Sequence, residues 1–361
     1  MTTAAYQAKS SEILQAFEEK GALRIEADVL QPAETLLDLY GEDIRARAYV
    51  TQDALRGEQM LRPDFTVPVV QMHMSDGAEP ARYTYAGRVF RKQENDPERA
   101  SEYLQVGYEV FDRHNPAQAD AEVFALIQSQ LHGLDVRPIT GDIGVLTAAV
   151  KGLKTTDARK SALLRHIWRP NRFQALLDRF GGRAKMPETR SAMLAHSNPM
   201  AEVGAIIGLR SHAEIQARIE ALREDAKASP ISKDEVALIE TLLGIEATYS
   251  ETMEKLTSIL GEMPSIGAAL ETIKLRGDAL TACGVDIECL PFEASFGRTS
   301  MEYYDGFVFG FKANADPSLP NIASGGRYDA LCQRLGQGKS IPAVGGVIRP
   351  DLIVDLQQGT A

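Results

Sequence analysis

Hydrophobic positions along the chain follow different spacings in different regions, and these spacings predict distinct elements. Near the start, apolar residues recur at helical spacing over residues 1–24, with Gly21 closing the main run. Residues 82–90 and 105–111 instead alternate polar with β-branched or aromatic residues, which predicts two strands. Residues 120–131 place their apolar side chains on one side, as a helix does. An antiparallel sheet with helices packed against it is the expected arrangement.

The spacing changes between residues 144 and 280. Successive amphipathic stretches have a period close to that of a helix, such as the one through Ile215, Ile219 and Leu222. Helix breakers, of which Ser229-Pro230 is one, separate these stretches. This region is therefore predicted to be a mainly helical insertion.

Strand patterns return after the helical region. Residues 287–290, 307–311 and 343–348 are rich in β-formers and predict strands. The glycine pair at 325–326 predicts a tight turn that leads into a short helix ending near Gly336. The sheet is thus expected to be built from both ends of the chain.

The expected architecture is α+β, with one discontinuous domain over residues 1–143 and 281–361 and the insertion region over 144–280. A chain of 361 residues is long enough to bury a substantial core. The start shows no basic segment followed by an apolar one, and no apolar run reaches the roughly 18 residues of a membrane span, so we expect a cytoplasmic protein without membrane contact. The three cysteines form no CxxC pair, which favours reduced thiols.

Two polar clusters in the first third of the chain are candidates for chemistry. Asp64 follows an Arg-Pro pair, where its carboxylate is suited to receive an ammonium group; a surface turn is the alternative. Gln105 and Glu109 are four residues apart, so they share one face of a strand. With Arg91 on the preceding strand they suit a cleft for a phosphate ligand, although a solvated hairpin has the same pattern.

Three more clusters lie near the end of the chain. Tyr303 and Tyr304 precede a hydrophobic strand, where they either line a pocket or divide between core and surface. The glycines within residues 324–329 either allow close approach to a ligand or form a helix-entry turn. Arg349 follows the glycine pair 345–346 and suits a phosphate, a carboxylate or a surface ion pair.

Charge and missing motifs argue against several classes of protein. The net charge is −11, from 39 basic and 50 acidic residues, which favours a small-molecule or protein partner over a nucleic-acid backbone. Dinucleotide, P-loop, zinc-protease and nucleophile-elbow motifs are absent. The six histidines lack metal-ligand spacing, so we expect neither a metal nor a cofactor.

Taken in order, the segments LRPDFT, GRVFR, LQVGYEVF, MEYYDG, GGRYDAL and GGVIR resemble the core of the class II aminoacyl-tRNA synthetases in its histidyl form. The likeness covers about residues 10–355, and residues 27–33, with Pro32, resemble the first, dimer-forming motif of that class. The resemblance implies an antiparallel sheet flanked by helices, and a homodimer.

The same resemblance implies a histidine pocket with polar and phenolic members: Asp64, Thr66, Gln105, Glu109, Tyr303 and Tyr304. The first four would face the amino end of the ligand and the two tyrosines the imidazole. Arg91 and Arg349 match the arginines that hold ATP phosphates in the family, which implies a vestigial nucleotide site.

Departures from the family pattern imply that adenylation is lost. Gln93 stands where a glutamate reads adenine, Ser101 replaces a phosphate-contacting arginine, and Thr299 replaces the arginine that acts on the substrate carboxylate. The neighbouring Arg298 is expected to point to the opposite face of a strand. Without these cations the transition-state charge is not stabilised, so no catalytic residue is expected. Because the chain ends shortly after Arg349, we also expect no anticodon-binding domain.

This pattern resembles the regulatory subunits of ATP phosphoribosyltransferase. The resemblance implies a homodimer within a hetero-oligomer that also contains a short-form catalytic subunit, which carries out the first step of L-histidine biosynthesis. It further implies feedback by L-histidine, either through a sensing pocket in this chain or through the partner alone, in which case the pocket is vestigial. Two alternatives are a truncated histidyl-tRNA synthetase-like amino-acid ligase and a tRNA-sensing pseudo-synthetase; the acidic charge argues against tRNA.

Overall fold

A central sheet organises the computed structural model, which describes residues 3–40, 44–93, 99–201, 204, 208–298 and 303–359. Within this part of the chain the sheet has nine strands in the order β1-β5-β6-β12-β11-β10-β7-β9-β8. All neighbouring strands are antiparallel except the β1–β5 and β7–β9 pairs. The strands are β1 (Leu23–Arg24), β5 (Ala81–Phe90), β6 (Glu102–Phe111), β7 (Val136–Asp142), β8 (Glu246–Thr248), β9 (Pro291–Glu293), β10 (Phe307–Ala313), β11 (Ala323–Arg327) and β12 (Ala343–Ile348). The predicted α+β class, with a largely antiparallel sheet built from both ends of the chain, is confirmed.

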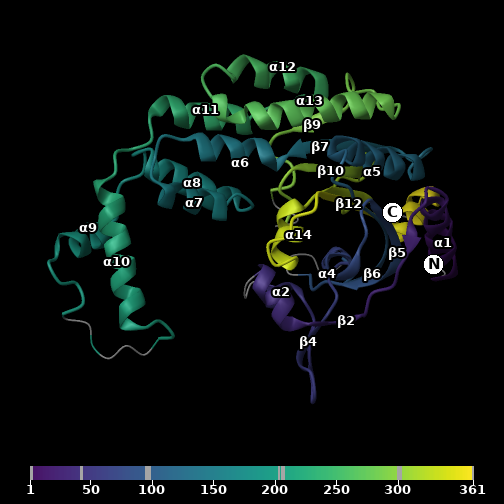
Figure 1. Cartoon of the computed structure of the whole chain (residues 1–361), viewed down its shortest axis with the longest axis horizontal. Coiled ribbons are helices and arrows are strands. Elements are labelled where there is room, and N and C mark those ends of the chain that lie inside the picture. The colour runs from purple at the N-terminus through teal and green to yellow at the C-terminus, as the bar shows by residue number, and fades with distance from the viewer. Residues whose placement is uncertain are drawn as a thin grey trace.

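Helices cover both faces of this sheet: α1 (Thr3–Glu19), α5 (Pro116–Gln130) and α15 (Pro350–Gln357) on one, and α4 (Thr66–Asp76) and α14 (Asp329–Leu335) on the other. The alternation along β6 shows why. Tyr108 contacts the ring of Phe17 on α1, and its hydroxyl donates to Glu122 on α5 at 2.6 Å. The next residue, Glu109, faces Thr66 of α4 instead. Both chain ends lie on the α1 side (Figure 1).

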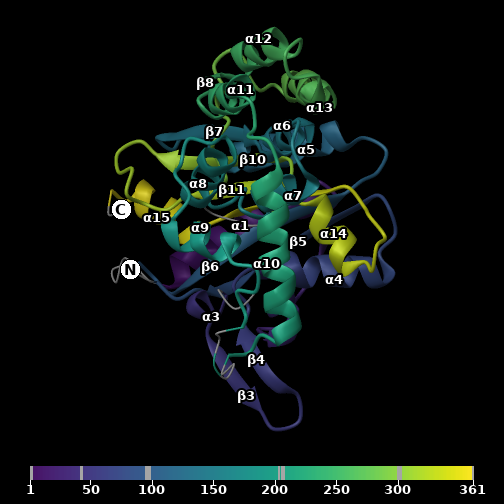
Figure 2. The same cartoon turned by 90° about the vertical axis from the view of Figure 1, so that its left-hand side faces the viewer.

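A smaller three-stranded sheet projects below the main one (Figure 2). It consists of β2 (Leu30–Pro32), β3 (Val50–Asp53) and β4 (Gly57–Leu61), and it adjoins α2 (Ala33–Tyr40) and α3 (Ile44–Arg47). Pro32 lies at the end of β2, in the segment that resembles the first class II motif. The hydrophobic patterns of the sequence did not reveal this sheet, because its strands are too short to show a clear alternation.

The middle of the chain is mainly helical, as predicted. Its helices are α6 (Ile143–Gly152), α7 (Asp157–Arg165), α8 (Pro170–Phe180), α9 (Glu188–Ala195), α10 (His212–Lys227), α11 (Lys233–Leu243), α12 (Tyr249–Ile259), the 3₁₀ turn η1 (Pro264–Ile266) and α13 (Gly267–Ala282). Capping boxes at Ser211, Ser232 and Thr248 start α10, α11 and α12. Helices α9 and α10 extend away from the sheet (Figure 1). Because β8 joins the edge of the sheet, the domain division at residues 144 and 280 stays a prediction.

Two local predictions in the last third of the chain are wrong. Residues 287–289 form a turn in which Asp286 accepts the backbone N–H of Glu288 at 3.0 Å, and the strand starts only at Pro291. The pair Gly325-Gly326 forms no turn but lies in β11, in the middle of the sheet. A Cβ on Gly325 would meet the carbonyl oxygen of Gly345 at 2.3 Å, so close strand packing is what requires glycine there.

Four buried charged residues join the helical region to the sheet. Arg276 of α13 donates to Asp120 of α5 at 2.8 Å and to Asp142 at the end of β7 at 2.9 Å. Asp120 also accepts from Arg327 of β11 at 2.6 Å. Arg276 and Asp120 are each 1% exposed at their side chains, so each charge depends on the others for compensation.

We expect Asp120→Ala to lower the free energy of unfolding by about 3–5 kcal/mol, because it leaves two buried guanidinium groups short of a counter-charge. Urea unfolding followed by circular dichroism measures this change. Asp278→Ala is the matched control, since Asp278 lies exposed on the same α13 helix as Arg276. Equal unfolding midpoints for the two variants would contradict a stabilising role for the network.

Candidate functional site

Glu109 lies at the centre of a cluster of hydroxyl groups. It extends from β6 toward α4 and α14, and it is only 1% exposed. Tyr328 donates to Glu109 Oε2 at 2.5 Å, Tyr85 donates to Oε1 at 2.7 Å, and Thr66 Oγ1 donates to Oε1 at 3.3 Å. The three hydroxyls come from different elements, so the carboxylate joins β5, α4 and the start of α14.

The protonation of Glu109 is balanced near neutral pH. Burial raises the pKa of its carboxyl group to about 7, and the hydrogen bonds from Tyr328, Tyr85 and Thr66 oppose that rise. The negative charge of Asp64 raises the pKa further. A carboxyl group of this kind is able to accept or to donate a hydrogen bond to a ligand.

Glycines make the space that Glu109 and Tyr85 occupy. A Cβ on Gly345 of β12 would lie 1.3 Å from Glu109 Oε2, and a Cβ on Gly107 would lie 2.1 Å from the Tyr85 ring. The strand register places Gly345 opposite Glu109 and Gly107 opposite Tyr85. Gly345 and Gly107 therefore leave the space that the Glu109 carboxylate and the Tyr85 ring fill.

The polar residues predicted for the amino end lie around this cluster. Asp64 is buried just before α4 and accepts the backbone N–H of Val67 at 3.5 Å. Burial raises the pKa of Asp64, and the charge of Arg91 opposes this rise. Gln105 is buried on the same face of β6 as Glu109, and its side-chain oxygen has no hydrogen-bond partner within the described ranges. An unpaired buried acceptor of this kind suits an N–H group of a ligand.

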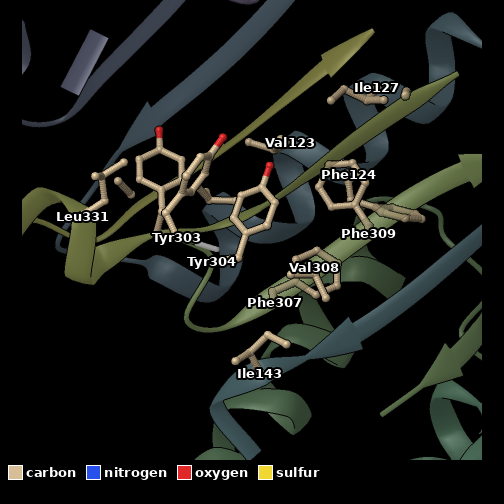
Figure 3. Packing of buried hydrophobic residues seen from close by; sticks show 14 of the residues in the cluster. Val123, Phe124, Ile127, Ile143, Tyr303, Tyr304, Phe307, Val308, Phe309 and Leu331 are labelled. Carbon is tan, nitrogen blue, oxygen red and sulfur yellow. The ribbon is translucent and has the colours of Figure 1, made fainter. Parts of the chain in front are cut away.

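Both predicted tyrosines point inward. Tyr303 and Tyr304 are buried and pack edge to face with their ring centres 4.9 Å apart, so a division between core and surface is wrong. Figure 3 shows the two rings side by side, with their hydroxyl groups pointing in the same general direction. Tyr303 donates to Thr66 Oγ1 at 3.4 Å, and its ring packs against Tyr328. The structure thus brings the tyrosines to the Glu109 cluster.

Arg91 and Arg349 line one pocket of about 410 Å³. Arg91 Nε donates to the carbonyl of Pro63 at 2.7 Å. Arg349 donates to Asp351 at 2.9 Å, and its guanidinium carbon lies 4.0 Å from the centre of the Tyr103 ring. The Arg349 ion pair neutralises part of the charge that a phosphate would otherwise meet.

Gln93 departs from the synthetase pattern and Arg298 lies beside such a position, and both have structural partners. The Gln93 amide donates to the carbonyls of Arg91 and Ala100 at 3.3 and 3.2 Å. Arg298 lies in a turn, so the strand argument for its direction is wrong. Its Nε donates to the carbonyl of Ile167 at 2.8 Å, which directs it to the start of α8. Thr299 lies outside the described residues.

Two residues of the cluster escaped the sequence analysis. Tyr85 and Tyr328 bind Glu109 most closely, yet neither stands out by spacing. Tyr85 faces Gly107 across the β5–β6 pair, so the register of the strands would have identified it.

Among the described residues, no group of histidine, cysteine and acidic side chains is arranged to hold a metal. None of the described helices has both the length and the apolar character to cross a membrane.

Comparisons of structure place this fold among the histidyl-tRNA synthetases. A structure from Bacillus halodurans described as an ATP phosphoribosyltransferase regulatory subunit/histidyl-tRNA synthetase aligns with a TM-score of 0.68 and 21% identity, over 98% of this chain and 79% of that one. The histidyl-tRNA synthetase from Nostoc aligns with a TM-score of 0.65 and 18% identity, over 99% of this chain and 72% of that one. The family model for histidyl-tRNA synthetase matches residues 1–228 and 213–353. Fold and sequence together define a histidyl-tRNA synthetase-like protein of class II.

Comparison of sequences narrows this class. The ATP phosphoribosyltransferase regulatory subunit of Allorhizobium ampelinum is 30% identical over 356 residues, which cover 92% of this chain and 93% of that protein. The protein of the same name from Brucella anthropi is 29% identical over 341 residues, 89% of each chain. The chain belongs to the family of ATP phosphoribosyltransferase regulatory subunits.

The raised pKa of Glu109 predicts a particular pH dependence of stability. Its carboxyl group binds a proton more tightly in the folded state than at the ordinary pKa of 4.5, so stability is lost as the pH rises from about 4.5 to about 7. We expect Glu109→Gln to remove this loss, because an amide does not titrate. Unfolding by urea across this pH range, with Glu224→Gln on exposed α10 as control, measures it. A slope that is the same in all three proteins would contradict the prediction.

Proposed function

We propose that this chain is a non-catalytic subunit that a short-form ATP phosphoribosyltransferase catalytic subunit requires for activity in the first step of L-histidine biosynthesis. Family membership supports a regulatory role, since the relatives from Allorhizobium and Brucella carry that name. The observation that carries the proposal is the contrast between two neighbouring sites. The residues predicted for the amino-acid pocket converge on Glu109. On the phosphate side, Ser101 and Thr299 stand where the synthetase pattern has arginines, and Arg349 is in an ion pair.

Loss of adenylation follows from the chemistry of the phosphate side. Forming an aminoacyl adenylate develops negative charge at the transferring phosphate, and fixed cations stabilise that charge. Ser101 and Thr299 supply no cation, and Arg298 donates to the carbonyl of Ile167 instead. Gln93 uses its amide within its own loop. Binding an amino acid without activating it suits a sensor.

We further propose that L-histidine occupies the Glu109 cluster and carries feedback inhibition. Asp64 would hold the ammonium group, together with the side-chain oxygen of Gln105 that lacks a partner in the described structure. The imidazole ring would lie at the Glu109 end of the cluster, beside the phenols. The carboxyl group of Glu109 and a ring nitrogen of histidine both gain or lose a proton near neutral pH, so they suit a hydrogen bond with each other. In this proposal Glu109 faces the imidazole ring, whereas the resemblance implied that it faces the amino end of the ligand. Feedback then requires that histidine favours one conformation of the complex.

Activation is tested by mixing the purified chain with the short-form catalytic subunit of the same organism. We expect phosphoribosyl-ATP formation to rise strongly on mixing and to be slow for either protein alone. A mixture that is no faster than the catalytic subunit by itself would refute the central proposal.

Loss of adenylation is tested by histidine-dependent exchange of pyrophosphate into ATP. This exchange should be absent for this chain and present for a histidyl-tRNA synthetase measured in parallel. Exchange by this chain would refute the loss of adenylation.

Histidine sensing is tested with variants of the pocket. Asp64→Asn removes the charge expected to meet the ammonium group, so the histidine concentration for half inhibition should rise roughly tenfold or more. Calorimetric titration of histidine into the chain alone should show the same weakening. Asp278→Asn carries the same change on an exposed site of α13 and should leave both values unchanged. Unaltered inhibition by histidine in Asp64→Asn would assign the sensing site to the partner.

A further inference from the structure

A second basic pocket lies between the α7–α8 connection and α14. Its volume is about 410 Å³, and its lining includes Arg165, Arg169 and Arg334. Tyr303 also contributes to its wall, so the pocket adjoins the Glu109 cluster. It shares no lining residue with the pocket of Arg91 and Arg349. It is therefore separate from that pocket, and the proposed function assigns no ligand to it.

The balance of charge in this pocket is positive. Among the described residues that line it, Asp305 is the one acidic residue, and its carboxylate accepts the backbone N–H groups of Asp329 and Ala330 at 3.1 and 2.5 Å. These bonds engage Asp305 at the start of α14. The guanidinium groups of Arg165 and Arg334 form no hydrogen bond or ion pair with any residue of the described ranges. The guanidinium groups of Arg165 and Arg334, which line the same hollow, therefore favour an anionic ligand.

His166 lines the same pocket and provides a second observation. Its Nδ1 atom is buried and has no hydrogen-bond partner in the described part of the chain. Burial lowers the pKa of His166, and the charges of Arg169, Arg172 and Arg165 lower it further. An anion placed among these arginines would relieve the repulsion and offer His166 a partner.

Aromatic side chains complete the pocket. The Trp168 indole donates to the carbonyl of Tyr304 at 3.2 Å, which fixes its orientation beside the arginines. We propose that this pocket binds a small phosphorylated metabolite, with the phosphate held by Arg165, Arg169 and Arg334 and the organic part packed against Trp168. The volume lies within the roughly 300–1,000 Å³ range of small-molecule sites. Since Tyr303 also contacts Thr66, the bound metabolite would lie next to the amino-acid site.

The single tryptophan of the chain makes the proposal directly measurable. The full chain, without any catalytic subunit, is titrated with ribose 5-phosphate and with pyrophosphate at constant ionic strength, and Trp168 fluorescence is recorded. We expect a saturable change with either phosphate compound and none with ribose. Arg165→Gln and Arg334→Gln should weaken binding roughly tenfold or more, because each removes charged hydrogen bonds to phosphate.

Two controls locate the site. Arg137→Gln makes the same change on an exposed residue of β7 and should leave binding intact. Arg349→Gln alters the other pocket and should also leave the Trp168 signal intact. The proposal is overturned if no saturable change occurs, if sodium sulfate has the same effect at equal ionic strength, or if the Gln variants at 165 and 334 bind like Arg137→Gln. It is equally overturned if binding is lost in Arg349→Gln and kept in Arg165→Gln; circular dichroism checks that each variant is folded.

Discussion

The architecture depends on the compensation of buried charge around Asp120. Its carboxylate lies between Arg276 of the helical region and Arg327 of the sheet, in a place with almost no solvent. Charges in such surroundings are tolerated only when each meets an opposite charge in good geometry. Arg276 also reaches Asp142, where β7 ends and α6 begins. This cluster of buried charges therefore fixes how α13 and the start of α6 pack against the sheet.

Close strand packing shapes the pocket from the same sheet. Arg327 and Tyr328 are neighbours in the chain, yet Arg327 joins the Asp120 cluster and Tyr328 donates to Glu109. Gly345 leaves the space that the Glu109 carboxylate fills, and Gly326 lies against Tyr304. The buried charge cluster and the proposed histidine site therefore share strands, so a change that disturbs the register of β11 or β12 would affect both.

The pocket of Arg91 and Arg349 and the pocket beside Tyr303 differ in the ion pairing of some of their arginines. In the pocket of Arg91 and Arg349, Arg349 pairs with Asp351 and stacks on Tyr103. In the pocket beside Tyr303, Arg165 and Arg334 have no such partner among the described residues. An arginine that is already paired has less to gain from an anion than one that is not. This difference is why we propose the phosphorylated-metabolite site in the second pocket, while a vestigial nucleotide site in the first stays a prediction.

The sequence by itself determined the class of fold, the mainly helical middle and most residues of the candidate pocket. Alternating strands and the order of short motifs are local signals, and Asp64, Gln105 and Tyr303 were found from them. Tertiary structure decided the features that depend on register and burial. It places Gly325 in a central strand, brings Tyr85 to Glu109 and brings Arg276 to Asp120. Such contacts join residues that are distant in the chain, and the spacing of side chains along one segment carries no information about which segment packs against it.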